Sequence, residues 1–189
     1  MQVSQIPYYK NTIFIVPLFI IFVGMLEAKI HAPKGEKSKI KLKIGGKNKT
    51  YYELDENGLN YKGVGKRYEV GDSMRIGIYS RSLKAQTGKK IRKYGYTVQI
   101  DNHKPQRLKY EKFGSNVTSD ERPGWNYTQS GIWVIYLPVK KEGYKIKVKP
   151  LNGNNPVVYV RLSSTELKRE GKIGGRIDPV NRKIRSKIE

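Results

Sequence analysis

The sequence predicts an all-β fold, an antiparallel two-sheet β-sandwich, and three observations support it. In several segments apolar residues recur at every second position, which is the spacing of a strand with one buried face. Turn-forming Gly, Asn and Pro residues separate these segments at regular intervals, and no segment has the apolar spacing of an amphipathic helix. Roughly nine or ten short strands of this kind are typical of a sandwich, with a small β-barrel as the alternative.

Residues 1–28 are predicted to be a signal peptide. Thr12–Leu26 is an unbroken apolar run that follows a basic residue and precedes small residues suited to cleavage. The run is shorter than the about 20 residues of a membrane-spanning helix and contains a proline, so we expect cleavage, after Ala28 or Ala32, rather than a retained anchor. The protein is therefore expected to be exported, and to be periplasmic, displayed at the cell surface or secreted.

The chain contains no cysteine. A small exported domain without disulfides depends on side-chain burial and sheet hydrogen bonds for its stability. This composition favours a bacterial envelope protein over a eukaryotic secreted one.

Residues 29–38 are predicted to be a linker and residues 39–164 the β-domain. The domain begins with Lys39–Ile44, which alternates lysine with isoleucine or leucine, and Lys49–Leu54 returns as its hairpin partner after a Gly-Gly turn. Further strands are predicted at Leu59–Gly63, Arg67–Val70, Ser73–Ser80, Lys93–Asp101, Gln106–Phe113, Ile132–Leu137, Tyr144–Lys149 and Val157–Leu162, the last two as a hairpin.

Three segments lack this alternation. Ser82–Arg92 is predicted to be a long hairpin loop, and Gly114–Gly131 the longest irregular stretch of the domain. Residues 165–189 are rich in Lys and Arg and contain too few apolar residues for a core, which predicts a basic flexible C-terminal tail. Because long loops often carry binding surfaces, Gly114–Gly131 is a candidate binding region.

The formal net charge of +22 on 189 residues is extreme. Such a field attracts polyanions, among them acidic polysaccharides, phosphorylated lipopolysaccharide, anionic lipids and nucleic acids. Lysine outnumbers arginine, and lysine supplies point charges rather than bidentate contacts, which argues against sequence-specific nucleic-acid recognition. The alternative interpretation is that the lysines keep a β-protein soluble and protect its sheet edges.

Two lysine ladders and two aromatic residues are the candidate ligand-binding residues. Successive lysines of a ladder lie about 6.6–7 Å apart along a strand, close to the repeat of a polyanion. If the two ladders lie near each other they form one cationic sheet face, and otherwise each is an ordinary solvated face. The aromatic residues follow a turn and could stack on sugars or bases. The candidates are Lys39, Lys41, Lys43, Lys145, Lys147, Lys149, Trp125 and Tyr127.

Catalytic and metal-binding patterns are missing from the sequence. His31 and His103 are the only histidines, and no zinc spacing, phosphate loop or nucleophile motif is present. We therefore predict a non-enzymatic module, without cofactor or metal, that binds an anionic envelope polymer or an acidic protein.

Two alternatives stay open. One is a structural or assembly component of the cell envelope that docks other proteins by strand addition. The other is a glycan-active hydrolase, which needs two carboxylates about 5–10 Å apart in a cleft.

Overall fold

The computed structural model describes residues 28–85, 91–151 and 156–168. Within these residues the fold is all-β, with antiparallel pairing throughout its 11 strands and no helix, and the sheet is not closed into a barrel. The strands are β1 (Lys29–His31), β2 (Lys39–Ile44), β3 (Lys47–Glu53), β4 (Leu59–Val64), β5 (Ser73–Ala85), β6 (Ile91–Ile100), β7 (Gln106–Val117), β8 (Trp125–Thr128), β9 (Gly131–Pro138), β10 (Tyr144–Pro150) and β11 (Val158–Leu167). The predicted signal peptide lies outside the described residues except for Ala28, and so does the predicted tail beyond Lys168.

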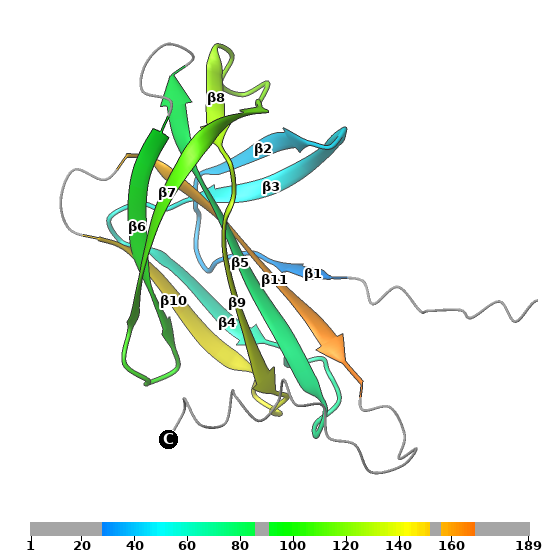
Figure 1. Ribbon diagram of the computed structural model, residues 1–189. Coiled ribbons are helices and arrows are strands. Elements are labelled where there is room, and N and C mark those ends of the chain that lie inside the picture. Colours follow the sequence, from blue (N-terminus) through cyan, green and yellow to red (C-terminus); the bar gives the residue numbers. More distant parts are fainter. Residues whose placement is uncertain (1–27, 86–90, 152–155, 169–189) are drawn as a thin grey trace, which may run out of the picture.

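Hydrogen-bonded neighbours follow the order β2-β3-β11-β5-β8-β7-β6-β10-β4, while β1 also pairs with β11 and β9 with β5. Because the sheet bends strongly, β4, β10 and β6 lie opposite β5, β9 and β11 (Figure 1). Apolar side chains from both groups of strands fill the space between them and form the main core.

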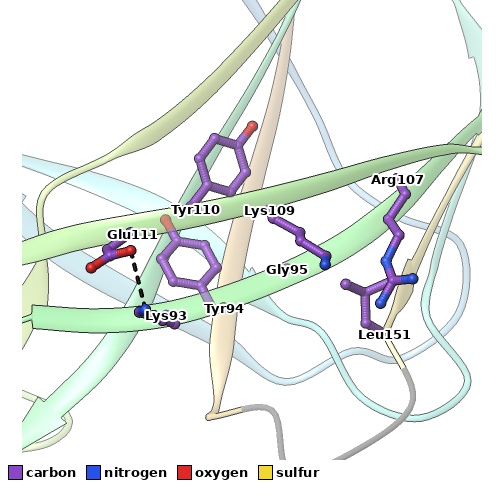
Figure 2. A pocket seen from close by; sticks show the side chains of 8 residues that line it. All are labelled: Lys93, Tyr94, Gly95, Arg107, Lys109, Tyr110, Glu111 and Leu151. Atoms are coloured by element: carbon purple, nitrogen blue, oxygen red, sulfur yellow. Dashed lines mark ion pairs between the residues drawn. The ribbon is translucent and has the colours of Figure 1, made fainter.

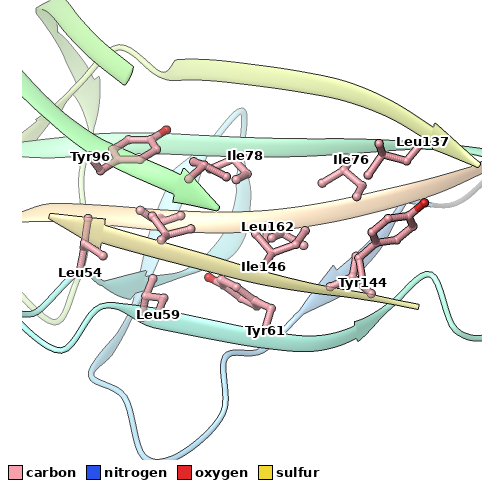
Figure 3. Close-up of a cluster of buried hydrophobic side chains, with 14 of the residues drawn as sticks. Leu54, Leu59, Tyr61, Ile76, Ile78, Tyr96, Leu137, Tyr144, Ile146 and Leu162 are labelled. Atoms are coloured by element: carbon pink, nitrogen blue, oxygen red, sulfur yellow. The ribbon is translucent and has the colours of Figure 1, made fainter. Parts of the chain in front are cut away.

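Period-two alternation explains the main core. Met74, Ile76 and Ile78 of β5 are fully buried, as their spacing predicts. Across the core, Ile146 of β10 is also fully buried (Figure 3), and so is Val148 of the same strand. Each such side chain contributes about 1.5–3 kcal/mol through burial, so the alternating strands supply most of the driving force for folding.

A second, smaller core lies beneath the β2–β3 hairpin. Leu42 of β2 is fully buried there beside Tyr127 of β8 and Tyr159 of β11. The amide of Lys43 donates a hydrogen bond of 2.9 Å to the carbonyl of Thr118, which holds β2 against the segment that follows β7. The hairpin therefore packs on its own cluster instead of extending into solvent.

The two predicted loops are shorter than expected. β5 continues to Ala85 and β6 begins at Ile91, so most of Ser82–Arg92 is strand. β7 continues to Val117, and β8 lies inside the predicted irregular stretch Gly114–Gly131. These polar segments form strands because their backbones pair with one another, as Leu83 does with Tyr127, and such pairing requires no apolar alternation.

Two other predictions about strands are wrong. Arg67–Val70 is not a strand, because turn hydrogen bonds from Lys66 to Gly63 and from Tyr68 to Gly65 bend the chain there. β10 and β11 do not form a hairpin: β10 pairs with β4 and β6, while β11 pairs with β5, β3 and β1. The two strands lie on opposite sides of the main core.

The strands extend past both predicted domain boundaries. β1 lies within the predicted linker and pairs with Leu162–Ser164, on the same edge of β11 that β3 occupies earlier along the strand. β11 continues to Leu167, where it still pairs with β5. The folded unit thus includes a short N-terminal strand that its few residues could not reveal.

Candidate functional site: a cationic sheet face

The outer face of β4, β10, β6 and β7 carries the candidate site. Side chains on this face alternate with those of the main core, so Tyr144, Ile146 and Val148 point inward and the lysines between them point outward. We call this surface the cationic face and define it by seven exposed residues: Lys62, Lys93, Arg107, Lys109, Lys145, Lys147 and Lys149.

Strand register sets the spacing of these cations. Lys147 lies opposite Gln99 of β6, and Lys149 lies opposite Thr97, which in turn lies opposite Arg107 of β7. Since neighbouring strands are about 4.8 Å apart, the Cα atoms of Lys149 and Arg107 are separated by roughly 10 Å. Polar, uncharged side chains thus lie between columns of positive charge, an arrangement that offers hydrogen bonds as well as charge to a ligand.

Little negative charge balances this face. Glu111 is the acid that lies among these residues on β7, and its carboxylate is 3.4 Å from the ammonium of Lys93. Lys145, Lys147 and Lys149 have no ion-pair partner within residues 28–85, 91–151 and 156–168. The face is therefore strongly electropositive.

The charge continues beyond β4. The close approach of the Lys34 side chain and its positive charge lower the pKa of Lys62. Two ammonium groups this close repel each other, and an anion between them would relieve the repulsion.

A shallow groove of about 460 Å³ runs along β6 and β7 on this side of the molecule. Its lining includes Lys93 and Glu111 at one end and Arg107 beside Leu151 at the other, with Gly95 between them (Figure 2). A Cβ atom at Gly95 would lie 2.6 Å from the carbonyl oxygen of Leu108 and 2.7 Å from Cδ1 of Leu151. Glycine is therefore required here for the close packing of the strands, and it leaves the groove open.

A second groove, of about 590 Å³, shares Gly95 and Leu151 with the first and is lined by three carboxylates. Asp55 bonds to the ammonium of Lys37 at 2.8 Å, and Glu53 lies 3.4 Å from the guanidinium of Arg122. Two of the three acids are thus already paired with cations, which does not favour their use as a catalytic pair.

The first lysine ladder does not join this face. Lys39, Lys41 and Lys43 are exposed, as alternation predicts, but β2 and β10 stand near opposite ends of the pairing order (Figure 1). Acidic residues also approach β2: the ammonium of Lys43 lies 2.7 Å from Asp120, and Glu121 accepts a 3.4 Å hydrogen bond from the amide of Lys41. The two ladders therefore do not form one continuous cationic surface.

The two predicted aromatic contacts differ from each other. Trp125 is 40% exposed on β8, which β7 and β6 separate from β10 in the pairing order. Tyr127 is fully buried in the second core, where its ring centroid lies 5.7 Å from that of Tyr159. A stacking role for Tyr127 is wrong, because its ring does not reach the surface.

Sequence reasoning missed Lys62, Lys93, Arg107 and Lys109 as members of the site. Arg107 and Lys109 alternate with Leu108 and Tyr110, so their outward direction could have been read from the strand pattern. Their position beside β10 could not, because it depends on long-range pairing of β6 with both β7 and β10.

A partly buried hydrogen-bond network surrounds His31. Nε2 of His31 and the hydroxyl of Tyr68 each lie 2.7 Å from Oγ of Ser164. Burial, together with the positive charge of Lys29, lowers the pKa of His31 to about 4, so the ring is neutral at neutral pH. Since Ser164 is fully buried, this network joins β1 to β11 and does not offer a nucleophile to substrate.

Neither a metal cluster nor a spanning helix is found in the part of the chain that the structure describes. No group of three or more His, Cys, Asp or Glu residues there could hold a metal ion. No helix there is long and apolar enough to cross a membrane.

No family model and no curated protein matches this sequence. Solved structures resemble it only distantly. A GH115 4-O-methyl-α-glucuronidase, BtGH115A, with specificity for decorated arabinogalactans is 19% identical, with a TM-score of 0.38, over 71% of this chain and 16% of that one. The Agl-KA catalytic domain is 11% identical, with a TM-score of 0.36, over 79% of this chain and 30% of that one. The globular domain of a zebrafish complement 1qA protein is 14% identical, with a TM-score of 0.33, over 76% of this chain and 98% of that one. This chain thus spans less than a third of the first two of these proteins, and at such TM-scores none of the three indicates its function.

Proposed function

We propose that this protein is an exported, non-enzymatic β-sandwich interaction module that binds an anionic polymer of the cell envelope through its cationic face. The sandwich interpretation is supported by the main core, which lies between two groups of strands. Export is supported by the apolar run at the N-terminus. The binding role is carried by one observation: seven exposed cations share a sheet face of the described residues, where Glu111 is already paired with Lys93, and Asp101, beside Lys145, with Lys140.

The physical basis is counterion release. A polyanion that lies across β10, β6 and β7 neutralises several of these cations and frees the small ions condensed on both partners. Thr97 and Gln99 between the cations can bond to hydroxyl groups, which favours an acidic polysaccharide over a partner with charge alone. We therefore take an acidic polysaccharide as the preferred class of polymer.

Binding to immobilised polygalacturonate at two salt concentrations tests the proposal, with uncharged dextran as the control. We expect retention by polygalacturonate alone, and an affinity that falls about 10- to 100-fold between about 50 and about 200 mM salt, as engagement of a few cations requires. Binding that is insensitive to salt would contradict an electrostatic face. Release of reducing ends from the polymer would instead support the hydrolase alternative.

A matched pair of triple variants locates the site. Changing Lys145, Lys147 and Lys149 to Gln should lower affinity at least about tenfold and reduce the slope of log affinity against log salt by about 2 to 3. The control changes Lys39, Lys41 and Lys43 to Gln, which removes the same charge at the same spacing from β2. Equal losses in the two variants would mean that net charge, and not the cationic face, determines binding.

A further inference from the structure

Phe113 interrupts the charged pattern of the outward side chains on β7. Arg107, Lys109 and Glu111 precede it at every second position, and all three are exposed on the cationic side of the strand. Phe113 follows them on the same side and is 56% exposed. It belongs to neither hydrophobic core of the described residues. Packing of the fold therefore does not explain a large apolar side chain at this position.

The backbone of Phe113 is held on both sides. On one side it pairs with Ile91 of β6, and on the other its carbonyl accepts a hydrogen bond of 2.8 Å from the amide of Gln129. Directly opposite residues of an antiparallel pair lie on the same face, so Ile91 and Phe113 together form an apolar platform. Because the strands fix this platform in place, a ligand that packs on it loses little free energy to ordering of the protein.

The platform continues the groove along β6 and β7. Lys93 and Glu111 line the end of the groove nearest to the platform, and each is two residues from it along its strand (Figure 2). Two residues of a strand span about 6.6–7 Å. A ligand that extends along the groove from Gly95 thus meets charged groups first and an apolar surface next.

The size of the platform favours a sugar over a protein as its partner. A stable protein interface buries about 800 Å² on each partner, around a centre that is apolar. Here the apolar surface is limited to two side chains. Lys93 and Glu111 border it on the groove side, and Ser115 follows Phe113 on β7. One face of a pyranose ring consists largely of C–H groups and has about the area of an aromatic ring, so it matches this platform.

We propose that Phe113 stacks on a pyranose ring of the acidic polysaccharide that the cationic face binds, while Lys109 and Arg107 hold carboxylates of the same polymer. Because this role rests on the proposed function, it makes that function more specific: the ligand carries both anionic groups and apolar sugar faces. Inorganic polyphosphate has the charge without a C–H face, and it has nothing to place on the platform. Phe113 thus distinguishes polysaccharides from other polyanions, which the cations alone do not.

Phe113→Ala tests the proposal, with polygalacturonate and inorganic polyphosphate as the probes. We expect the affinity for polygalacturonate to fall about fivefold or more, as the loss of one stacked ring predicts. The slope of log affinity against log salt should stay as in the wild type, because no charge is removed. The affinity for polyphosphate should not change. Phe113→Trp, which keeps an aromatic surface, should bind polygalacturonate as the wild type does.

Ile132→Ala is the matched control. Ile132 is similarly exposed, at 53%, but it lies on β9, across the main core from the cationic face. This variant should bind both polymers as the wild type does. An unchanged affinity of Phe113→Ala for polygalacturonate overturns the proposal, and so does an equal loss in Ile132→Ala or an equal loss for polyphosphate.

Vesicles of anionic phospholipid provide a further comparison. If Phe113→Ala lost more affinity for the vesicles than for polygalacturonate, the platform would serve a membrane surface and the stacking role would be wrong. Wild-type protein that does not bind polygalacturonate at all would contradict the proposed function itself. Wild-type binding that Phe113→Ala leaves intact would contradict the stacking role alone, so the two failures are distinguishable.

Discussion

The β2 and β10 strands contain nearly the same pattern of lysines and apolar residues, yet the fold places them in different surroundings. β10 lies between β4 and β6, so Lys147 has Asn60 on one side and Gln99 on the other. β2 has β3 along one side and ends beside Asp120 on the other. Similar sequences therefore have different surroundings: the lysines of β10 lie in the middle of a charged sheet face, whereas those of β2 lie on an edge strand beside acidic residues.

This difference shows that alternation and strand pairing determine separate properties of a lysine ladder. Alternation decides which side chains point outward, and it does so correctly in both strands. Pairing decides whether the outward charges add to those of neighbouring strands or meet opposite charge. A lysine ladder in a sequence thus indicates a solvated face, and only its neighbours determine whether that face can bind a polyanion.

The largest expected effect concerns the buried side of the two strands. Ile146→Ala in β10 should cost about 3–5 kcal/mol of unfolding free energy, and Leu42→Ala in β2 about 2–4 kcal/mol. Both side chains are fully buried, but Ile146 lies in the larger main core and Leu42 in the smaller second core. Urea denaturation with an unchanged slope measures both values. A greater loss for Leu42→Ala would mean that the second core holds the fold together.

A smaller effect is expected at β1, an edge strand held by a neutral histidine instead of lysines. Because the pKa of His31 is lowered from 6.5 to about 4, the unfolded chain binds its proton first as the pH falls. Stability should therefore be complete above pH 6.5 and decline toward pH 4. The loss due to this group should be about 1–2 kcal/mol, reduced from the full linkage value because the ring is partly exposed.

The variant His31→Gln keeps a side chain that can bond to Ser164 but cannot titrate in this range. The difference between the wild-type and variant stabilities should change with pH only between 6.5 and about 4. Thermal unfolding of both proteins across this pH range measures the difference. Parallel curves for the two proteins would show that His31 does not control the pH dependence.

Single substitutions at the centre of each ladder should produce a modest difference in ligand binding. Lys147→Gln should weaken polygalacturonate binding about two- to fourfold, since it removes one cation from the middle of the cationic face. Lys41→Gln, the equivalent change in β2, should alter the affinity by less than about 1.5-fold. Titration of both variants at low salt measures the ratio. A larger loss for Lys41→Gln would place the binding surface on β2.

Much of this fold could be predicted from sequence, because local alternation is a direct consequence of strand geometry. The alternation of Ser73–Ser80 predicts that Ile76 and Ile78 point inward, and both are fully buried. Strand pairing could not be predicted, because β6 and β10 are far apart in the chain. The sequence of neither strand specifies the strand with which it pairs. For the same reason, the sequence predicts the lysines of the cationic face on β10 but not its cations on β4, β6 and β7.

The burial of Tyr127 has a similar cause. In sequence it follows a Pro-Gly turn and resembles a surface aromatic residue. In the fold, β8 pairs with β5 and β7, and its tyrosine packs into the second core beneath the β2–β3 hairpin. A residue in a short polar strand can therefore be central to a core that distant segments assemble.

The smallest expected effect comes from releasing the β2 ladder from its acid. Asp120→Asn removes the carboxylate 2.7 Å from Lys43 and leaves a side chain of similar size. Because both partners are well exposed, the change should cost less than about 1 kcal/mol of stability. It should raise polygalacturonate affinity by no more than about twofold, since one additional cation on β2 still lies away from the cationic face. The matched comparison is Glu111→Gln, which frees Lys93 within that face and should give a larger gain. If Asp120→Asn gave the larger gain, β2 and β10 would be equivalent in binding despite their different neighbours, and the distinction between the two ladders would fail.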